Sequence, residues 1–177
     1  MMLILVSGGA ASGKSAFAEE LLVKGGAAPR IYLATMELRD AESRERAQRH
    51  RRMRAGKDFI TVERPLDLAG LEIPEGCGVL LEDLGNLCAN ECFGPIGMAG
   101  AEERMMSGLS RLAERAALLV AVSNEIFTDG TDYGGQPAAY LNCLASLNRR
   151  AAALAAAVYE VVCGIPVCWK GAGLCVR

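Results

Sequence analysis

Histidine is almost absent from this sequence of 177 residues, because His50 is the only one. Zinc sites that use two imidazole ligands, and reaction mechanisms that need two imidazole groups, are therefore excluded. An excess of positive charge is also missing, since 19 Lys and Arg residues face 21 Asp and Glu residues and the net charge is −2. This balance gives no reason to expect a nucleic acid as a partner.

Paired cysteine motifs and long hydrophobic runs are missing too. The seven cysteines are odd in number, and no two of them form a C-x-x-C motif. Four lie in apolar or Ala-rich surroundings, where a free cysteine behaves as a small hydrophobic residue, so we expect free thiols and a cytoplasmic protein. The apolar start MMLILV has no charged residue and is followed at once by Ser7-Gly8-Gly9. It is too short for a membrane span or a signal peptide.

Enough apolar material is present for one core, since 51% of the residues are hydrophobic and 23% are charged. Short runs that are apolar throughout alternate with helix-like stretches, which is typical of buried strands in a parallel sheet. The expected strands are 3–6, 31–34, 59–63, 78–81, 118–122, 158–163 and 166–169, the expected helices are 14–23, 41–54, 101–116 and 137–157, and long loops are expected at 90–100 and 128–136. The sequence thus predicts an α/β fold, with a mostly parallel sheet covered by helices on both faces, as a single domain over residues 1–177.

The segment between the first strand and the first helix carries the strongest functional signal. The pattern G-x-x-x-x-G-K-[ST] is satisfied by Gly8, Gly9, Ala10, Ala11, Ser12, Gly13, Lys14 and Ser15. The glycines allow backbone N–H groups to curl around phosphate oxygens, and the following helix presents its positive end to the same anion. The motif predicts that Lys14 reaches the β- and γ-phosphates of a nucleotide and that the Ser15 hydroxyl binds Mg²⁺. It indicates a fold like that of P-loop nucleoside triphosphate hydrolases.

An acidic residue at the end of another core strand is expected to share the magnesium ion. The run Val79-Leu80-Leu81-Glu82-Asp83 fits this expectation, with either Glu82 or Asp83 as the acidic partner. The guanine-reading motif N-K-x-D is missing, and Ser123-Asn124-Glu125 at the end of a later strand does not identify the base.

A basic segment surrounds the single histidine. Residues 39–57 carry eight Lys or Arg residues against three acids, and Arg46, His50 and Arg54 would share one face of a helix. Two interpretations remain open: a solvated helix in which His50 is incidental, and a phosphate-binding helix in which arginines hold phosphate and a neutral His50 attacks phosphorus. A local RNA-binding patch is less favoured, because the segment has no aromatic residue to stack on bases.

Five segments, in matching order, resemble one enzyme family. They are ILVSGGAASGKS at residues 4–15, IYLAT at 31–35, RAQRHRRMR at 46–54, VLLED at 79–83 and VSNE at 122–125. Together with Asn148 and Gly164-Ile165-Pro166, they resemble the bifunctional adenosylcobinamide kinase/adenosylcobinamide-phosphate guanylyltransferase family of cobalamin biosynthesis. The most specific element is His50 with Arg54 four residues later.

The resemblance implies a P-loop α/β fold, a homotrimer, ATP or GTP as nucleotide and a corrinoid substrate that is phosphorylated and then joined to GMP from GTP. By the same matching, His50 is the histidine that becomes guanylylated. From the phosphate-loop motif and the acidic strand end, Lys14 is expected to be the second catalytic residue, and Ser15 and Glu82 are expected to hold Mg²⁺. Besides residues 8–15, the implied nucleotide contacts are Ala34, Thr35, Met36, Arg51, Arg52, Met53, Arg54, Glu63 and Glu82. The sequence departs from the family pattern at Leu87, Ala89, Phe127–Gly130 and Leu141-Asn142.

The bifunctional transferase is therefore the leading hypothesis. The alternative is a monofunctional P-loop kinase for a small molecule, in which His50 is not a nucleophile and the arginines form a lid over the phosphates. A third possibility is a regulatory module that binds nucleotide without transferring any group.

Overall fold

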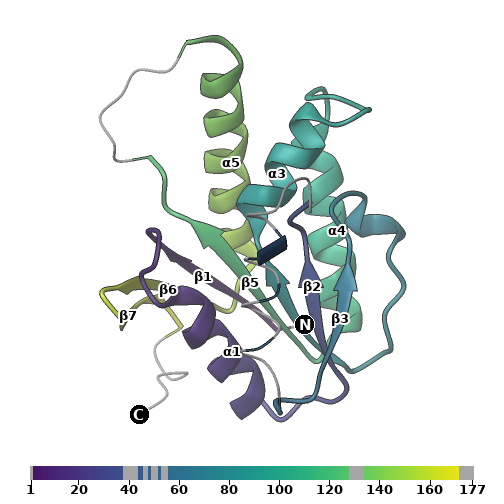
Figure 1. Ribbon diagram of the computed structural model, residues 1–177, viewed down its shortest axis with the longest axis vertical. Coiled ribbons are helices and arrows are strands. Elements are labelled where there is room, and N and C mark those ends of the chain that lie inside the picture. The colour runs from purple at the N-terminus through teal and green to yellow at the C-terminus, as the bar shows by residue number, and fades with distance from the viewer. Residues whose placement is uncertain are drawn as a thin grey trace.

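Strands and helices alternate along most of the chain in the computed structural model, which describes residues 2–37, 44, 45, 48, 52, 56–127 and 134–171 (Figure 1). The strands are β1 (Leu3–Gly8), β2 (Arg30–Ala34), β3 (Phe59–Glu63), β4 (Gly78–Glu82), β5 (Leu118–Asn124), β6 (Ala157–Val162) and β7 (Ile165–Lys170). The helices are α1 (Lys14–Lys24), α3 (Leu84–Phe93), α4 (Ala101–Arg115) and α5 (Gly135–Leu154), with a short 3-10 helix η1 (Leu68–Gly70).

All seven strands form one sheet in the order β3-β2-β4-β5-β1-β6-β7. Neighbouring strands from β3 to β6 are parallel, and β7 pairs antiparallel with β6. The first strand therefore lies inside the sheet, between two strands from the second half of the chain. The carboxyl ends of the six parallel strands meet at one edge, which is where open α/β sheets bind their ligands.

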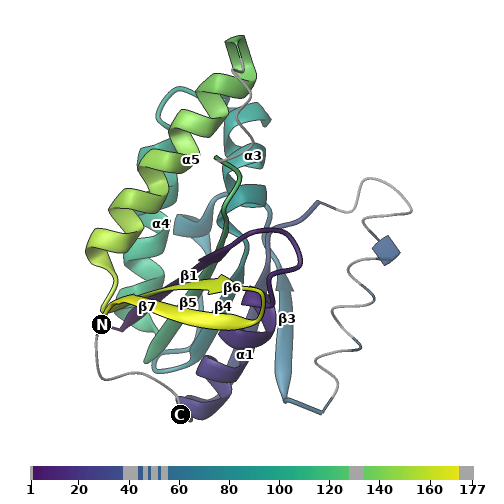
Figure 2. The same ribbon diagram turned by 90° about the vertical axis from the view of Figure 1, so that its left-hand side faces the viewer.

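Helices cover both faces of the sheet, as Figures 1 and 2 show. Helix α1 packs on one face, against a cluster that includes Ile4 and Val6. Helices α3, α4 and α5 pack on the other face, where Leu3 and Leu5 contribute to the larger cluster. Because successive side chains of a strand point to opposite faces, a strand covered on both sides must be apolar at every position. The predicted fold class is therefore confirmed.

Three of the predicted elements were wrong in part. The strands β3 and β7 are edge strands with one neighbour each and are not buried: Ile60 is 56% exposed and Trp169 is 70% exposed. The predicted helix 137–157 runs too far, since α5 ends at Leu154 and Ala157 already belongs to β6. The Ala-rich sequence gave no sign of this boundary, because alanine packs in both elements.

The two predicted loops were also wrong in part, and one predicted helix is not covered. Residues 84–93 form α3, a helix that was not expected, so the loop predicted at 90–100 begins later. Helix α5 begins at Gly135, inside the loop predicted at 128–136, whose residues 128–133 lie outside the described residues. The helix predicted over 41–54 falls mostly outside the described residues as well.

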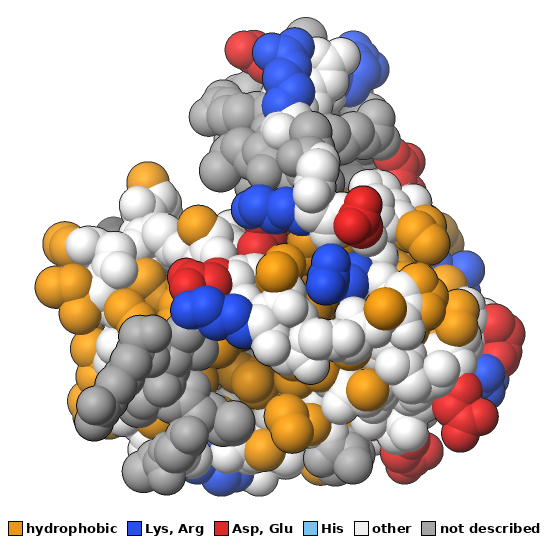
Figure 3. Space-filling model, turned by 90° about the horizontal axis from the view of Figure 1, so that it is seen from below, with side chains coloured by type: hydrophobic (Ala, Val, Ile, Leu, Met, Phe, Trp, Pro, Cys, Tyr) orange, Lys and Arg blue, Asp and Glu red, His pale blue; other side chains and the backbone are white. Residues whose placement is uncertain are grey.

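The surface mixes charges of both signs. On the face shown in Figure 3, Lys and Arg side chains lie among Asp and Glu side chains, and hydrophobic side chains are exposed toward the left, where β6 and β7 lie in Figure 1. The exposed hydrophobic residues of this hairpin are Val162, Ile165, Val167 and Trp169. None of the helices that the structure describes combines the length and apolar character needed to cross a membrane.

Candidate nucleotide-binding site

The phosphate loop connects β1 to α1 at the carboxyl edge of the sheet. Its backbone takes left-handed conformations at Ala11 (φ 55°) and Gly13 (φ 93°), which turn the chain sharply into the helix. At Gly8 an added Cβ would lie 2.5 Å from Ser12 Oγ and 2.7 Å from the carbonyl oxygen of Val161. Glycine is therefore required at Gly8 by a close approach of backbone to backbone, and at Gly13 by its dihedral angles.

The loop also rests on the turn between β6 and β7. The N–H of Gly164 donates to the carbonyl oxygen of Ser12 at 2.8 Å, and an added Cβ at Gly13 would lie 3.4 Å from the Cα atom of Gly164. The Oγ atom of Ser12 is buried and has no hydrogen-bond partner among the described residues. A buried hydroxyl without a partner is uncommon in proteins, and here it lies in a loop whose motif binds anions.

Lys14 begins α1 and folds back over this loop. Its side chain is mostly buried, and Nζ donates to the carbonyl oxygen of Gly9 at 3.0 Å. The ammonium group is thus held against the phosphate loop, the segment to which the motif assigns phosphate binding.

Ser15 and Glu82 bring the two halves of the predicted metal site together. The Ser15 hydroxyl donates to Oε1 of Glu82, at the end of β4. The second carboxylate oxygen, Oε2, is buried and has no hydrogen-bond partner among the described residues. Burial raises the pKa of Glu82 to about 7, although the Ser15 hydrogen bond partly opposes this. A hydroxyl beside a carboxylate with a free oxygen suits Mg²⁺, which prefers oxygen ligands and favours the charged form of the carboxylate.

Asp83 contacts different groups from Glu82. This difference decides which of the two acids lies beside Ser15 in the predicted magnesium site. Its Oδ1 accepts from the N–H of Asn86 at 2.7 Å, and its Oδ2 accepts from the Asn86 side chain at 3.0 Å. Asp83 is therefore the N-cap of α3, and such a cap typically stabilises a helix by about 1 kcal/mol. The structure assigns the contact with Ser15 to Glu82.

Thr35 holds the end of β4 against the end of β2. It is fully buried; its Oγ1 accepts from the N–H of Asp83 at 2.7 Å and lies 2.8 Å from the Asp83 carbonyl oxygen, to which it can donate. Asn90 of α3 donates to the carbonyl oxygens of Thr35, at 2.8 Å, and of Pro65, at 3.1 Å. These bonds join the ends of β2, β3 and β4, and so fix the backbone that carries Glu82.

The described residues place much of the predicted site at one edge. Residues 8–15, Ala34, Thr35, Met36, Glu63 and Glu82 all lie at or just beyond the carboxyl ends of parallel strands. Thr35 is buried, Ala34 and Met36 are half-buried, and Glu63 is exposed. Arg52 is exposed, whereas His50, Arg51, Met53 and Arg54 lie outside the described residues. The nucleotide contacts themselves stay predictions.

Sequence reasoning missed two supports of the site. Asn90 was placed in a loop, and the hydrogen bond from Ser123 Oγ to Asn148 Oδ1, at 2.7 Å, was not foreseen. Asp83 followed by Leu84 and Asn86 is a helix-capping signal that could have revealed α3 and thus Asn90. No sequence pattern indicates the pairing of Ser123 with Asn148, since the two residues meet only through the packing of α5 on the sheet.

Comparison with known proteins identifies the family. Residues 4–169 match the model of the family described as CobU, cobinamide kinase / cobinamide phosphate guanyltransferase. The chain belongs to this family.

Curated relatives span the same length. The bifunctional adenosylcobalamin biosynthesis protein CobP of Pseudomonas aeruginosa is 31% identical over 172 residues, which cover 94% of this chain and 96% of the relative. The bifunctional adenosylcobalamin biosynthesis protein CobU of Salmonella typhimurium is 31% identical over 182 residues, covering 94% and 98% of the two chains. The protein of the same name from Escherichia coli is 30% identical over 181 residues, with the same coverage. The family suggested by the sequence motifs is thus confirmed.

Solved structures are more distant. A KaiC-like protein from Pyrococcus horikoshii has a TM-score of 0.48 and 14% identity, covering 90% of this chain and 70% of that chain. The flagellar accessory protein FlaH of Methanocaldococcus jannaschii has a TM-score of 0.47 and 10% identity, covering 96% and 78% of the two chains.

Proposed function

We propose that this protein phosphorylates adenosylcobinamide with ATP or GTP and then transfers GMP from GTP to adenosylcobinamide phosphate, giving adenosylcobinamide-GDP. The observation that carries the proposal is the meeting of Lys14, Ser15 and Glu82 at the carboxyl edge of the sheet in a chain of the cobinamide kinase family. This edge has the groups that phosphoryl transfer requires.

In the kinase reaction, the backbone N–H groups of the phosphate loop bind the β- and γ-phosphates, and Lys14 exchanges its bond to Gly9 for a phosphate oxygen. Ser15 and Glu82 would hold Mg²⁺, which would neutralise charge on the phosphate oxygens. Thr35 keeps Glu82 in place through the backbone of residues 82 and 83. The corrinoid hydroxyl attacks the γ-phosphorus and loses its proton as the new P–O bond forms. The bond from the γ-phosphorus to the β–γ bridging oxygen breaks, and the nucleoside diphosphate leaves.

In the guanylyl transfer, His50 acts as the nucleophile. A neutral ring nitrogen attacks the α-phosphorus of GTP, a P–N bond forms and pyrophosphate leaves; a phosphate oxygen of the corrinoid phosphate then takes the GMP group and frees the histidine. Arg51, Arg52, Met53 and Arg54 contact the guanylate beside it. This assignment is supported by the sequence motif around His50 and by membership of the family.

The remaining parts of the proposal concern assembly and location. We propose that residues 1–177 act as one domain, that three chains assemble into a homotrimer, and that the protein works in the cytoplasm with small-molecule partners rather than nucleic acids. The support for the trimer is the family resemblance.

A labelling experiment tests the role of His50. The protein is incubated with GTP labelled at the α-phosphate, and we expect acid-labile label on the chain. His50→Ala should abolish this label and retain phosphorylation of adenosylcobinamide. Lys14→Ala should reduce the phosphorylation by a factor of at least about 100, since charge stabilisation of this kind is typically worth that much.

The matched control is Gln48→Ala, an exposed residue two positions before the histidine, which should label like the wild type. Because the chain has one histidine, no second imidazole can take the label. Equal labelling of the wild type and His50→Ala would refute the histidine mechanism. Phosphorylation without any labelled protein would favour the monofunctional kinase.

A further inference from the structure

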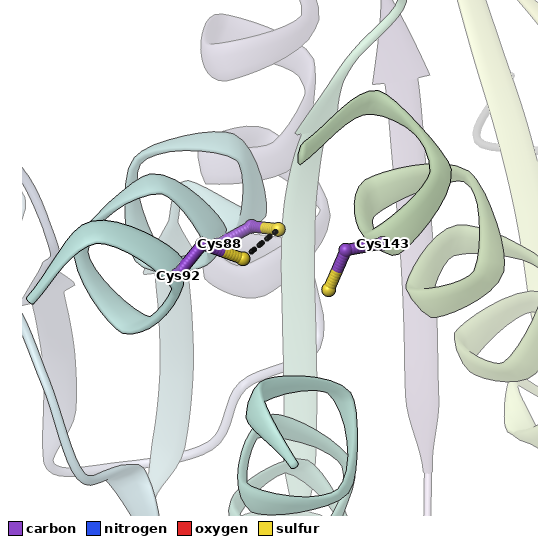
Figure 4. A group of neighbouring side chains, drawn as sticks. All are labelled: Cys88, Cys92 and Cys143. Carbon is purple, nitrogen blue, oxygen red and sulfur yellow. Dashed lines mark hydrogen bonds between the residues drawn. The ribbon is translucent and has the colours of Figure 1, made fainter. Parts of the chain in front are cut away.

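Three cysteines come together away from the phosphate loop, between α3 and α5 (Figure 4). They are Cys88 and Cys92 of α3 and Cys143 of α5, and we call them the thiol cluster. Their Sγ atoms all lie within 4.8 Å of one another. Cys88 and Cys92 are buried and Cys143 is half-buried, and all three are free thiols. Nothing in the proposed reactions uses these groups.

The spacing of the cluster suits a single metal ion. Cys88 and Cys92 are four residues apart, so they point to the same side of α3, and their Sγ atoms are 3.9 Å apart. A zinc ion binds thiolate sulfur at about 2.3 Å, so three sulfur atoms around one such ion lie about 3.8 to 4.0 Å apart. Because all three Sγ atoms lie within 4.8 Å of one another, Cys143 needs to move closer by at most about 1 Å. A rotation of about 30° about its Cα–Cβ bond supplies this movement.

The sulfur ligands and the apolar surroundings of the thiol cluster determine which metal ion fits best. The cluster adjoins an apolar core that includes Leu84, Leu87, Leu144 and Leu147, and sulfur ligands select soft ions such as Zn²⁺ and Cu⁺ over Mg²⁺ and Ca²⁺. Three thiolates leave a net charge of −1 with Zn²⁺ and of −2 with Cu⁺. Because burying charge in an apolar environment is costly, the divalent ion fits better.

We propose that Cys88, Cys92 and Cys143 form a zinc-binding site that links α3 to α5. Binding breaks three S–H bonds, forms three Zn–S bonds and releases three protons to the buffer, and a water molecule can take the fourth position of the ion. The site is separate from the proposed magnesium site, because that site has oxygen ligands from α1 and β4. The proposal does not depend on the function proposed above.

The pKa values of two of the thiols support the release of protons on zinc binding. Burial, together with the neighbouring thiols, raises the pKa of Cys88 well above its ordinary value and that of Cys92 to about 11. Cys88 and Cys92 therefore carry their protons near neutral pH, and the ion must displace these protons. Zinc affinity should consequently increase with pH.

The test uses the full chain, reduced with a reagent that contains no thiol, and Co²⁺ as a spectroscopic substitute for Zn²⁺. We expect one Co²⁺ per chain, a sulfur-to-cobalt charge-transfer band, its loss when Zn²⁺ is added, and release of three protons per ion. Cys143→Ala, at the half-buried position, should weaken binding by at least about 100-fold, since even outer partners of metal ligands are worth 10- to 100-fold. Cys88→Ala and Cys92→Ala should do the same.

Two control variants separate the cluster from other thiols. Cys77→Ala removes a buried cysteine elsewhere in the core, and Cys163→Ala removes an exposed one; both should bind Co²⁺ like the wild type. Zn²⁺ should also raise the melting temperature of the wild type and of both controls, and leave that of Cys143→Ala unchanged. The proposal is overturned if the wild type gives no charge-transfer band, if Cys143→Ala keeps the band, or if Cys163→Ala loses it.

Discussion

At the scale of single residues, Glu82 determines the electrostatics of the candidate site. Its carboxyl accepts the Ser15 hydrogen bond through one oxygen and leaves the other buried without a partner among the described residues. Burial raises its pKa from the ordinary 4.5 to about 7. The side chain is therefore partly protonated at neutral pH in the free protein, and a bound divalent cation would convert it to the charged form that a metal ligand requires.

The raised pKa of Glu82 predicts a pH-dependent stability. Between about pH 4.5 and 7 the folded protein keeps a proton that the unfolded chain has lost, so the contribution of Glu82 to the free energy of unfolding falls as the pH rises through this window and is lost above it. Glu82→Gln keeps the shape of the side chain without the ionisation. At pH 8 it should be more stable than the wild type by about 1 to 3 kcal/mol, and at pH 5 the difference should be less than about 1 kcal/mol.

Urea unfolding at the two pH values, without Mg²⁺ or nucleotide, measures this difference. Glu75→Gln, at an exposed position, is the matched control and should change the free energy of unfolding by less than about 0.5 kcal/mol at either pH. An effect of Glu82→Gln that is the same at pH 5 and pH 8 would show that the carboxyl does not titrate in this window.

At the scale of elements, the phosphate loop is positioned by strands that are distant in sequence. Gly8, the last residue of β1, lies against the backbone of β6, and Ser12 accepts from the turn that follows β6. The motif predicted that Gly8 and Gly13 form a sharp turn between strand and helix, but it did not predict which residues this turn packs against. The partner is set by the order of strands in the sheet, which local sequence does not encode.

Gly8→Ala tests this close packing. The added methyl group would lie 2.7 Å from the carbonyl oxygen of Val161, so the loop or β6 must shift, and overpacking of this kind typically costs about 1 to 3 kcal/mol. We expect a lower melting temperature and nucleotide binding weakened by at least about tenfold, measured by calorimetric titration. Gly134→Ala, where an added Cβ meets nothing within 4 Å, should keep the wild-type affinity. Unchanged nucleotide binding by Gly8→Ala would mean that the loop tolerates the shift.

The elements also show where sequence reasoning succeeds and where it fails. Strands β1, β4 and β5 were found because each begins with an unbroken run of four or five apolar residues, which follows from helices on both faces. Helix α3 was missed because it is short and its sequence, LGNLCANECF, shows little alternation of an apolar and a polar helix face. The sequence placed Lys14, Ser15, Thr35 and Glu82 in the predicted site, and all four lie at the carboxyl edge of the sheet. The hydrogen bonds of Thr35 and Asn90 that join neighbouring elements could not be predicted, because no local pattern reveals contacts between elements.

At the scale of the whole molecule, the homotrimer is a prediction that still needs a test. Strand β7 is an edge of the sheet with exposed hydrophobic residues, and it carries Trp169, the one tryptophan of the chain. Sedimentation equilibrium at micromolar concentration should give three times the chain mass of 18.7 kDa. A mass equal to one chain at all concentrations would contradict the trimer.

The fluorescence of Trp169 adds a local measurement. In the single chain the indole is 70% exposed and its Nε1 donates to Glu160 at 3.0 Å. If β7 lies at a contact between chains, the emission should shift to longer wavelength on dilution below the assembly concentration. If β7 lies elsewhere, the emission should not change while the mass falls.

The support of the phosphate loop by the turn after β6 has a consequence for biosynthesis. The loop is made among the first 15 residues, but the carbonyl of Val161 and the N–H of Gly164, against which it packs, are made about 150 residues later. Strand β1 likewise waits for β5 and β6 before it has either of its neighbours. A ribosome-bound chain that stops before residue 160 therefore carries the whole phosphate-loop motif without the backbone against which it packs. We expect such a chain to bind nucleotide only after the sheet is almost completely translated.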